Sequence, residues 1–178
     1  MAARSHQSRS VAPRLLTEVP FLGQSLPIEM ARSPLPLERV VEREGKLLLQ
    51  IPACIPADHL AERVRHLAER WLRAQARHHL QQRVNDLAIR LNVTPGPLAV
   101  KDTRSRWGSC SARGNLSFNW RLIMAPPWII DYLVAHELAH LRELNHSPRF
   151  WAVVRRVCPD YQSHRIWLRL AGERLMNW

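Results

Sequence analysis

The chain has 178 residues, a length typical of one domain, and its hydrophobic fraction of 46% is sufficient for a buried core. Its formal net charge of +11, carried almost wholly by arginine, favours anionic partners such as nucleic acid or nucleotides, but it equally fits a solvated basic surface. The longest apolar runs are too short for a transmembrane helix, and three cysteines without a C-x-x-C pair argue against a disulfide framework and for a reducing compartment.

Residues 1–16 are rich in serine and arginine, and no acidic residue precedes Glu18. This composition predicts a disordered basic tail, followed by a single domain over residues 17–178. The same segment lacks the continuous apolar run of a secretory signal. We therefore expect a cytoplasmic protein with no membrane association.

Two hairpins and a long helix are predicted in the first half of the chain. Residues 21–28 alternate around a turn, and residues 40–49 are interrupted at Glu44-Gly45, which is typical of a second hairpin. From Pro56 to near Asn92 the apolar residues recur at helical spacing, although the phase drifts along the segment.

Strands are predicted again over residues 98–124. Residues 104–111 and 116–122 flank a turn at residues 113–115, which predicts a hairpin whose second strand runs directly into the next helix. A strand that lies beside that helix would offer its edge to an extended peptide, which can bind by strand addition.

The helix that follows Pro126-Pro127 contains the string His136-Glu137-Leu138-Ala139-His140. Residues four apart lie on one helix face, so both imidazoles can reach a single metal ion. Glu137 is rotated off that face, where it can touch a water held by the metal without ligating the metal. The string therefore predicts a zinc hydrolase site with an open coordination position and a carboxylate base.

A third histidine, His146, follows six residues later in a predicted turn between two helices. Asn145 tolerates the left-handed conformation that ends a helix, and Ser147-Pro148 is typical of the start of the next one. The alternative interpretation is that the three histidines only decorate a helix end.

Three separated motifs occur in order: residues 106–111 (RWGSCS), residues 119–122 (NWRL), and the H-E-x-x-H string followed by residues 145–151 (NHSPRFW). Together they resemble the YgjP-like family of metal-dependent hydrolases over about residues 18–176. That family in turn resembles the SprT-like proteases. The resemblance implies an α+β fold, a compact zincin-like domain with a small, mostly antiparallel sheet, a long helix and a metal-binding helix. It also implies Zn²⁺ bound by His136, His140 and His146, with Glu137 as general base.

Further groups are candidates by residue type alone. An oxyanion donor is expected among Tyr132, Tyr161, His164 and Arg165, and a carboxylate that orients the ligating imidazoles is expected from Glu143 or Asp160.

The leading interpretation of function is a zinc-dependent peptidase that acts on polypeptides. One alternative is a metal-dependent hydrolase of nucleotide phosphoanhydrides, because the basic charge favours polyanionic substrates. The other is a nucleic-acid-binding protein with structural zinc. Three histidines beside a glutamate argue against it, because structural zinc sites are usually four-coordinate and rich in cysteine.

Overall fold

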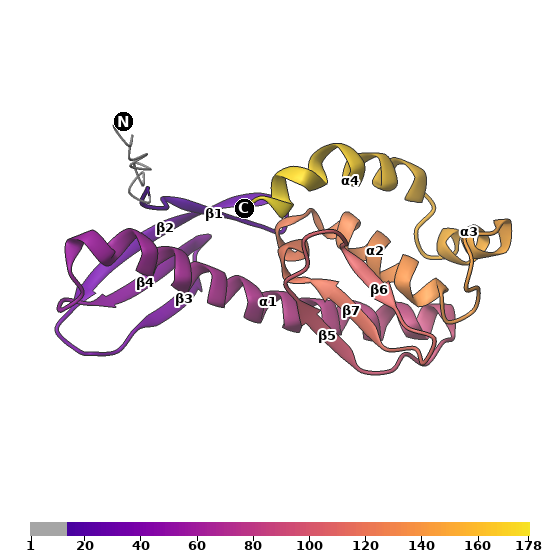
Figure 1. Ribbon diagram of the computed structural model, residues 1–178, viewed down its shortest axis with the longest axis horizontal. Coiled ribbons are helices and arrows are strands. Elements are labelled where there is room, and N and C mark those ends of the chain that lie inside the picture. Colours follow the sequence, from indigo (N-terminus) through magenta and orange to yellow (C-terminus); the bar gives the residue numbers. More distant parts are fainter. Residues whose placement is uncertain (1–13) are drawn as a thin grey trace, which may run out of the picture.

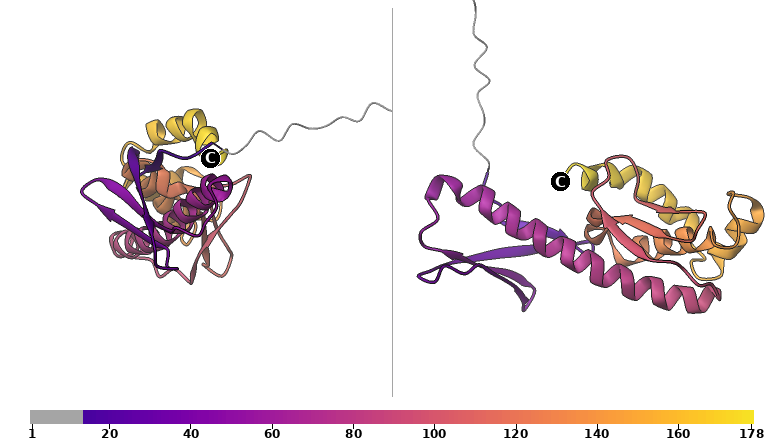
Figure 2. Two further views of the ribbon diagram at one scale, coloured as in Figure 1. Left: turned by 90° about the vertical axis from the view of Figure 1, so that its left-hand side faces the viewer. Right: turned by 60° about the horizontal axis from the view of Figure 1, so that its bottom comes forward.

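A computed structural model describes residues 14–178 (Figure 1). The described chain is elongated, with a sheet at each end and helix α1 (Leu60–Leu91) running from one end to the other (Figures 1 and 2). Strands and helices are mixed along the chain, so the predicted α+β class is confirmed. The predicted tail falls mostly on residues 1–13, which lie outside the described residues, and its boundary stays a prediction.

The N-terminal sheet has the strand order β1-β2-β4-β3. Its strands are β1 (Glu18–Phe21), β2 (Gln24–Ser33), β3 (Arg39–Arg43) and β4 (Lys46–Pro52). Both predicted hairpins are confirmed, and each turns through two left-handed residues: Leu22 (φ 49°) with Gly23 (φ 79°), and Glu44 (φ 54°) with Gly45 (φ 74°). Turns of this kind match the twist of antiparallel strands. The sequence did not indicate the parallel pairing of β2 with β4.

Helix α1 follows a single 3₁₀ turn, η1 (Ala57–His59). Its last residue is Leu91, and the left-handed backbone of the next residue, Asn92 (φ 53°), closes the helix. The first half of α1 packs on the N-terminal sheet. Alternate residues of β4 are buried in this part of the core: Leu47, Leu49 and Ile51. An ion pair between Arg63 and Glu38 ties α1 to the entry of β3.

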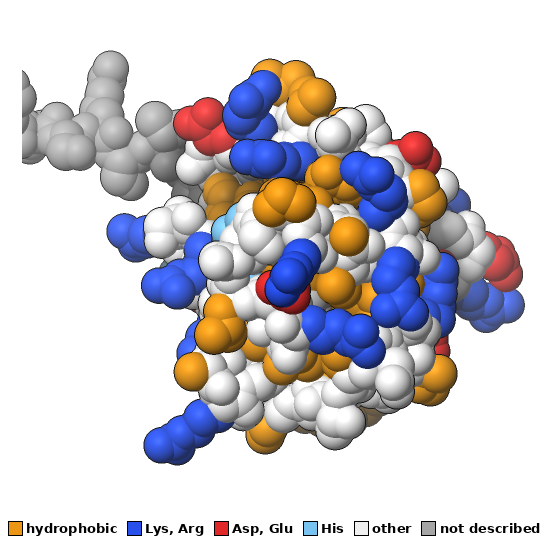
Figure 3. Space-filling model, turned by 90° about the vertical axis from the view of Figure 1, so that its right-hand side faces the viewer, with side chains coloured by type: hydrophobic (Ala, Val, Ile, Leu, Met, Phe, Trp, Pro, Cys, Tyr) orange, Lys and Arg blue, Asp and Glu red, His pale blue; other side chains and the backbone are white. Residues whose placement is uncertain are grey.

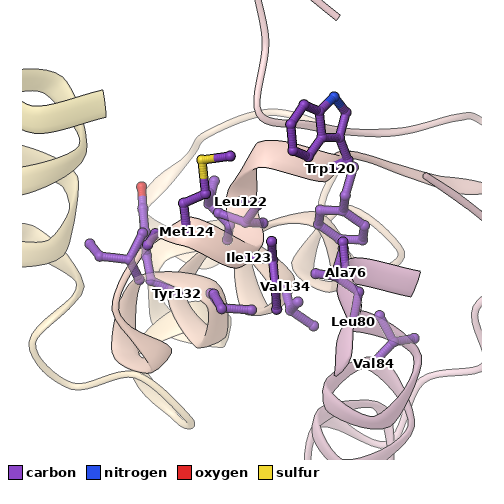
Figure 4. Close-up of a cluster of buried hydrophobic side chains, with 14 of the residues drawn as sticks. Ala76, Leu80, Val84, Trp120, Leu122, Ile123, Met124, Tyr132 and Val134 are labelled. Atoms are coloured by element: carbon purple, nitrogen blue, oxygen red, sulfur yellow. The ribbon is translucent and has the colours of Figure 1, made fainter. Parts of the chain in front are cut away.

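The second half of α1 packs on the 3₁₀ segment η2 (Trp120–Met124) and on helix α2 (Pro127–Ala139). Figure 4 shows this part of the core, where Leu80 and Val84 of α1 face Ile123 and Val134. The Arg83 guanidinium makes a two-point ion pair with Asp131, with nitrogen–oxygen distances of 2.6 and 3.0 Å. The helix that carries the H-E-x-x-H string is therefore fixed to α1 by both packing and charge.

The second sheet has the order β5-β7-β6, formed by β5 (Leu98–Lys101), β6 (Gly108–Cys110) and β7 (Leu116–Asn119). The predicted β6–β7 hairpin is antiparallel as expected, and β5 joins β7 in parallel. Strand β6 begins only at Gly108, and β7 ends at Asn119 instead of at Leu122. The physical reason is that the buried Asn119 side chain accepts a hydrogen bond from Arg121 N (2.9 Å) and thereby starts η2.

Two further helices complete the fold, α3 (Pro148–Arg155) and α4 (Tyr161–Met176). Both contact α2, and α4 lies along α2 while α3 sits beyond its C-terminal end (Figure 1). Among residues 14–178, none of the helices combines the length and the apolar character that a membrane span requires.

Candidate metal centre

Three imidazoles converge at the C-terminal end of α2. His136 lies in the helix, His140 follows its last residue with a backbone that is still helical (φ −64°, ψ −18°), and His146 precedes α3. One ring nitrogen from each comes within 4.8 Å of the others, and the Nε2 atoms of His136 and His146 are 3.0 Å apart. The spacing read from the sequence therefore brings all three rings to one point.

The chain reverses direction earlier than the sequence suggested. Helix α2 ends at Ala139, and the amides of Leu141 and Arg142 close the end by donating to the carbonyls of Leu138 and Ala139. Asn145 is not in the left-handed region, so its predicted role as helix terminator is wrong. The predicted start of the next helix is confirmed, because the Ser147 hydroxyl accepts a hydrogen bond from Phe150 N at 3.4 Å.

Phe150 packs against all three rings of the histidine cluster. Its ring centroid lies 4.9 Å from that of His136 and 4.7 Å from those of His140 and His146, and the side chain is fully buried. A single apolar ring thus fixes three imidazoles and keeps water from one side of them. Sequence reasoning assigned Phe150 no role, because the three rings that it contacts come together only in the folded chain.

Hydrogen bonding orients His140. Its Nδ1 lies 3.2 Å from the carbonyl oxygen of Glu143, which fixes the proton on Nδ1 and leaves the Nε2 lone pair free. The expected orienting group was a carboxylate of Glu143 or Asp160. The structure provides the Glu143 backbone oxygen instead, and Asp160 lies at the start of α4.

Burial favours the neutral form of two of the rings, those of His136 and His146. It lowers the pKa of His136 to about 3, with smaller contributions from His140, His146 and the positive charge of Arg165. Burial also lowers the pKa of His146, again with help from His140 and Arg165. Neutral imidazole is the form that binds metal, so these two rings are ready to act as ligands at pH 7.

The donor set fits a metal ion. His136 Nδ1 is buried without a hydrogen-bond partner among residues 14–178. The other ring nitrogen, Nε2, faces His146 and is the one available to make a polar contact. Two nitrogens of neutral rings at 3.0 Å are near the separation of about 3.3 Å that two ligands of a tetrahedral zinc ion would have. Nitrogen donors suit Zn, Cu, Fe and Ni better than Mg or Ca.

Glu137 follows His136 in α2, and its side chain lies in a nearly closed space. Its side chain is 5% exposed, and burial raises its pKa to about 7. Strand β6 passes directly over the carboxylate, because a Cβ atom at Gly108 would lie 2.6 Å from Glu137 Oε1. Only glycine leaves room for the carboxylate in its present position.

The four oxyanion candidates divide by location. The Tyr132 ring is 6.0 Å from that of His136, but the residue is buried, and burial raises its pKa to about 12. His164 is engaged with the buried Cys158, 3.1 Å from its thiol sulfur, and the Tyr161 ring stacks on Trp151. Arg165 is exposed and lies over the Trp151 ring. The structure therefore leaves Arg165 as the solvent-facing polar group of the four.

A sizeable hollow in the described residues lies away from the histidine cluster. About 710 Å³ of space separates the β1–β2 hairpin from the C-terminal end of α4, and its walls include Arg65, Trp167 and Trp178. None of the three clustered histidines lines it. Cavity size alone does not identify the site in this molecule.

Comparisons with known proteins agree with the chemistry of the site. The family described as "YgjP-like, metallopeptidase domain" matches residues 2–171. No curated protein matches the chain.

Two solved structures are similar to about half of it. They are the crystal structures of the metallopeptidase zymogens of Pyrococcus abyssi abylysin (20% identity, TM-score 0.47) and of Methanocaldococcus jannaschii jannalysin (22% identity, TM-score 0.43). Each match covers 51% of this chain, and 94% and 96% of the other chain respectively.

Proposed function

Because the chain belongs to the YgjP-like metallopeptidase family, we propose that it is a zinc-dependent peptidase with His136, His140 and His146 as metal ligands and Glu137 as general base. The family supplies the enzyme class and polypeptides as the substrate class. The observation that carries the residue roles is the convergence of three imidazoles at one point, together with a buried carboxylate at Glu137, the residue that follows His136.

The chain's own residues divide the work of peptide hydrolysis. Three neutral imidazoles would hold the ion without reducing its charge. When bound, zinc would polarise the scissile carbonyl and lower the pKa of the attacking water to about 7. Glu137 accepts a proton from that water and delivers it to the leaving amine. Its own pKa of about 7 suits a base that works at neutral pH.

Strand β6 supports a peptide substrate in particular. It is an edge strand, with β7 on one side and no described strand on the other. An extended peptide added to that edge would run past Glu137, over which the β6 backbone already passes at Gly108. Main-chain hydrogen bonds to β6 would hold the scissile bond independently of the substrate's side chains.

The two alternative functions gain no support. The family is a peptidase family, and nothing in the described site points to nucleotide or nucleic-acid recognition. Cys54, Cys110 and Cys158 all lie outside the histidine group, so the described residues do not complete a cysteine-rich structural zinc site.

The test combines metal content with hydrolysis of unfolded protein and of nucleoside triphosphates. We expect one zinc per chain in the wild type and in Glu137→Gln, with peptide cleavage reduced by about 10²- to 10⁴-fold in the variant. His140→Ala should lose zinc. Glu143→Gln is the matched control, because only the backbone oxygen of Glu143 contacts the cluster. Undiminished cleavage by zinc-loaded Glu137→Gln would refute the assignment, and Glu137-dependent release of phosphate would overturn the substrate class.

A further inference from the structure

A layered group of side chains leads from the histidine cluster to the surface of α4. The Trp151 ring lies 5.8 Å from that of His136 and 5.9 Å from that of His146. Tyr161 stacks on Trp151 at 4.8 Å with an interplanar angle of 14°. The Arg165 guanidinium lies 5.5 Å from the Trp151 centroid. Arg165 is therefore separated from two of the clustered imidazoles by a single aromatic ring.

This guanidinium is positioned but not neutralised. Residues 14–178 provide no ion-pair partner for Arg165, whereas Arg63, Arg83 and Arg121 each pair with a carboxylate. The contact with Trp151 holds its charge in place without cancelling it.

The surroundings are open and basic. A hollow of about 450 Å³ beside Arg165 is lined by Gln162, Ile166 and Arg169. Figure 3 shows the end of the molecule that carries α3, where Lys and Arg side chains far outnumber acidic ones. Arg165 is therefore an exposed positive charge, with a second arginine beside it, that a negatively charged group could reach from solvent.

We propose that Arg165 is a specificity-determining residue that binds a carboxylate of the peptide substrate near the scissile bond. The planar guanidinium matches a carboxylate with two parallel hydrogen bonds, which a lysine or an amide cannot reproduce. The carboxylate belongs either to an acidic side chain or to the free C-terminus of the substrate. This inference rests on the proposed function for the location of the reacting bond.

The first experiment compares three peptides with the same neutral core. The first peptide has an internal glutamate and an amidated C-terminus. The second has glutamine at that position and a free C-terminal carboxylate. The third, the neutral one, has glutamine and an amidated C-terminus. We expect the wild type to prefer a carboxylate-bearing peptide by about ten- to a hundredfold in kcat/KM, through KM. Which of the two is preferred identifies the source of the carboxylate.

Variants then assign the preference to one side chain. Arg165→Gln should abolish the difference between the carboxylate and neutral peptides, and Arg165→Lys should restore part of it. Arg174→Gln, an exposed arginine on the same helix that lines the other hollow, should behave as wild type. A wild type without preference, or a preference that persists in Arg165→Gln, would overturn the proposal. An equal fall in kcat on all peptides would also overturn it, because the residue would then act on the reacting carbonyl.

A binding measurement separates this proposal from the catalytic one. Fluorescein-labelled acidic and neutral peptides are titrated into zinc-loaded Glu137→Gln protein, with and without Arg165→Gln, and anisotropy reports the Kd. We expect the acidic peptide to bind about tenfold more weakly when Arg165 is replaced, and less tightly as salt rises. Equal binding in both proteins would refute carboxylate recognition, whether or not Glu137 proves to be the general base.

Discussion

Gly108 sets the position of the Glu137 carboxylate, and Gly108→Ala tests this directly. The added Cβ would lie 2.6 Å from Oε1 and 2.9 Å from Cγ of Glu137, whereas ordinary contact begins at 3.4 Å. The carboxylate must therefore move by roughly 0.8 Å, and a misplacement of about 1 Å can reduce a rate by about a hundredfold. Glu137 is 5% exposed, so it has little free space into which to move without leaving the cluster.

The backbone itself should tolerate alanine, because Gly108 lies in a strand and is not in the left-handed region. We expect the change in the free energy of unfolding to stay within about 1 kcal/mol. Zinc content should be unchanged, because the substituted atom meets Glu137 and none of the three histidines.

The assay is kcat for peptide hydrolysis, with zinc content and Tm measured on the same protein. Ser109→Ala is the control, since alternate residues of a strand point to opposite faces and Ser109 points away from Glu137. The steric reasoning would be wrong if Gly108→Ala retained wild-type kcat. It would also be wrong if the variant lost zinc or unfolded, because the close contact would then not be confined to the carboxylate.

Two further predictions concern stability. Burial raises the pKa of Asp102, but hydrogen bonds from Arg121 and Arg73 outweigh it and lower the pKa to about 2. Because the pKa of Asp102 is lower in the folded state, its stabilising effect is present above about pH 4 and is lost as the pH falls toward 2. The side chain is 44% exposed, so solvent weakens the effect. Asp102→Asn should therefore lower the free energy of unfolding, measured in urea, by only about 1 kcal/mol at pH 7 and by little at pH 2. Leu80 is fully buried where α1 meets η2 and α2, so Leu80→Ala should lower the free energy of unfolding by about 2–5 kcal/mol. Ile89 on the same helix is 80% exposed, so Ile89→Ala should change it by less than about 0.5 kcal/mol.

Features set by neighbours in sequence were predictable. Glu44-Gly45 turns a hairpin because both residues adopt the left-handed conformation, and Ser147 caps α3 through an amide three residues away. The H-E-x-x-H spacing works in the same way, since four residues bring His136 and His140 to one side of a helix.

Features set by distant segments were not predictable from local pattern. The parallel pairings of β2 with β4 and of β5 with β7 join strands that are not consecutive in the chain, and no periodicity encodes which strands become partners. Asn119 stops a strand-like run because its side chain, which also donates to Thr103 O at 2.6 Å, is buried by the tertiary fold. The role of Phe150 likewise depends on three rings that meet only when α2 and α3 are placed together.

We expect helix α1 to make the two ends of the molecule unfold as a single cooperative unit. Its 32 residues span about 48 Å, and its buried side chains run without a break from Val64 beside the N-terminal sheet to Leu91 beside the second. Melting one end would expose half of that stripe and remove the support for the other half, since helix formation is itself cooperative. Unfolding followed at the N-terminal sheet and at Trp120 should thus occur in one transition, and a fragment that lacks residues 14–92 would lose the surface on which α2 is built.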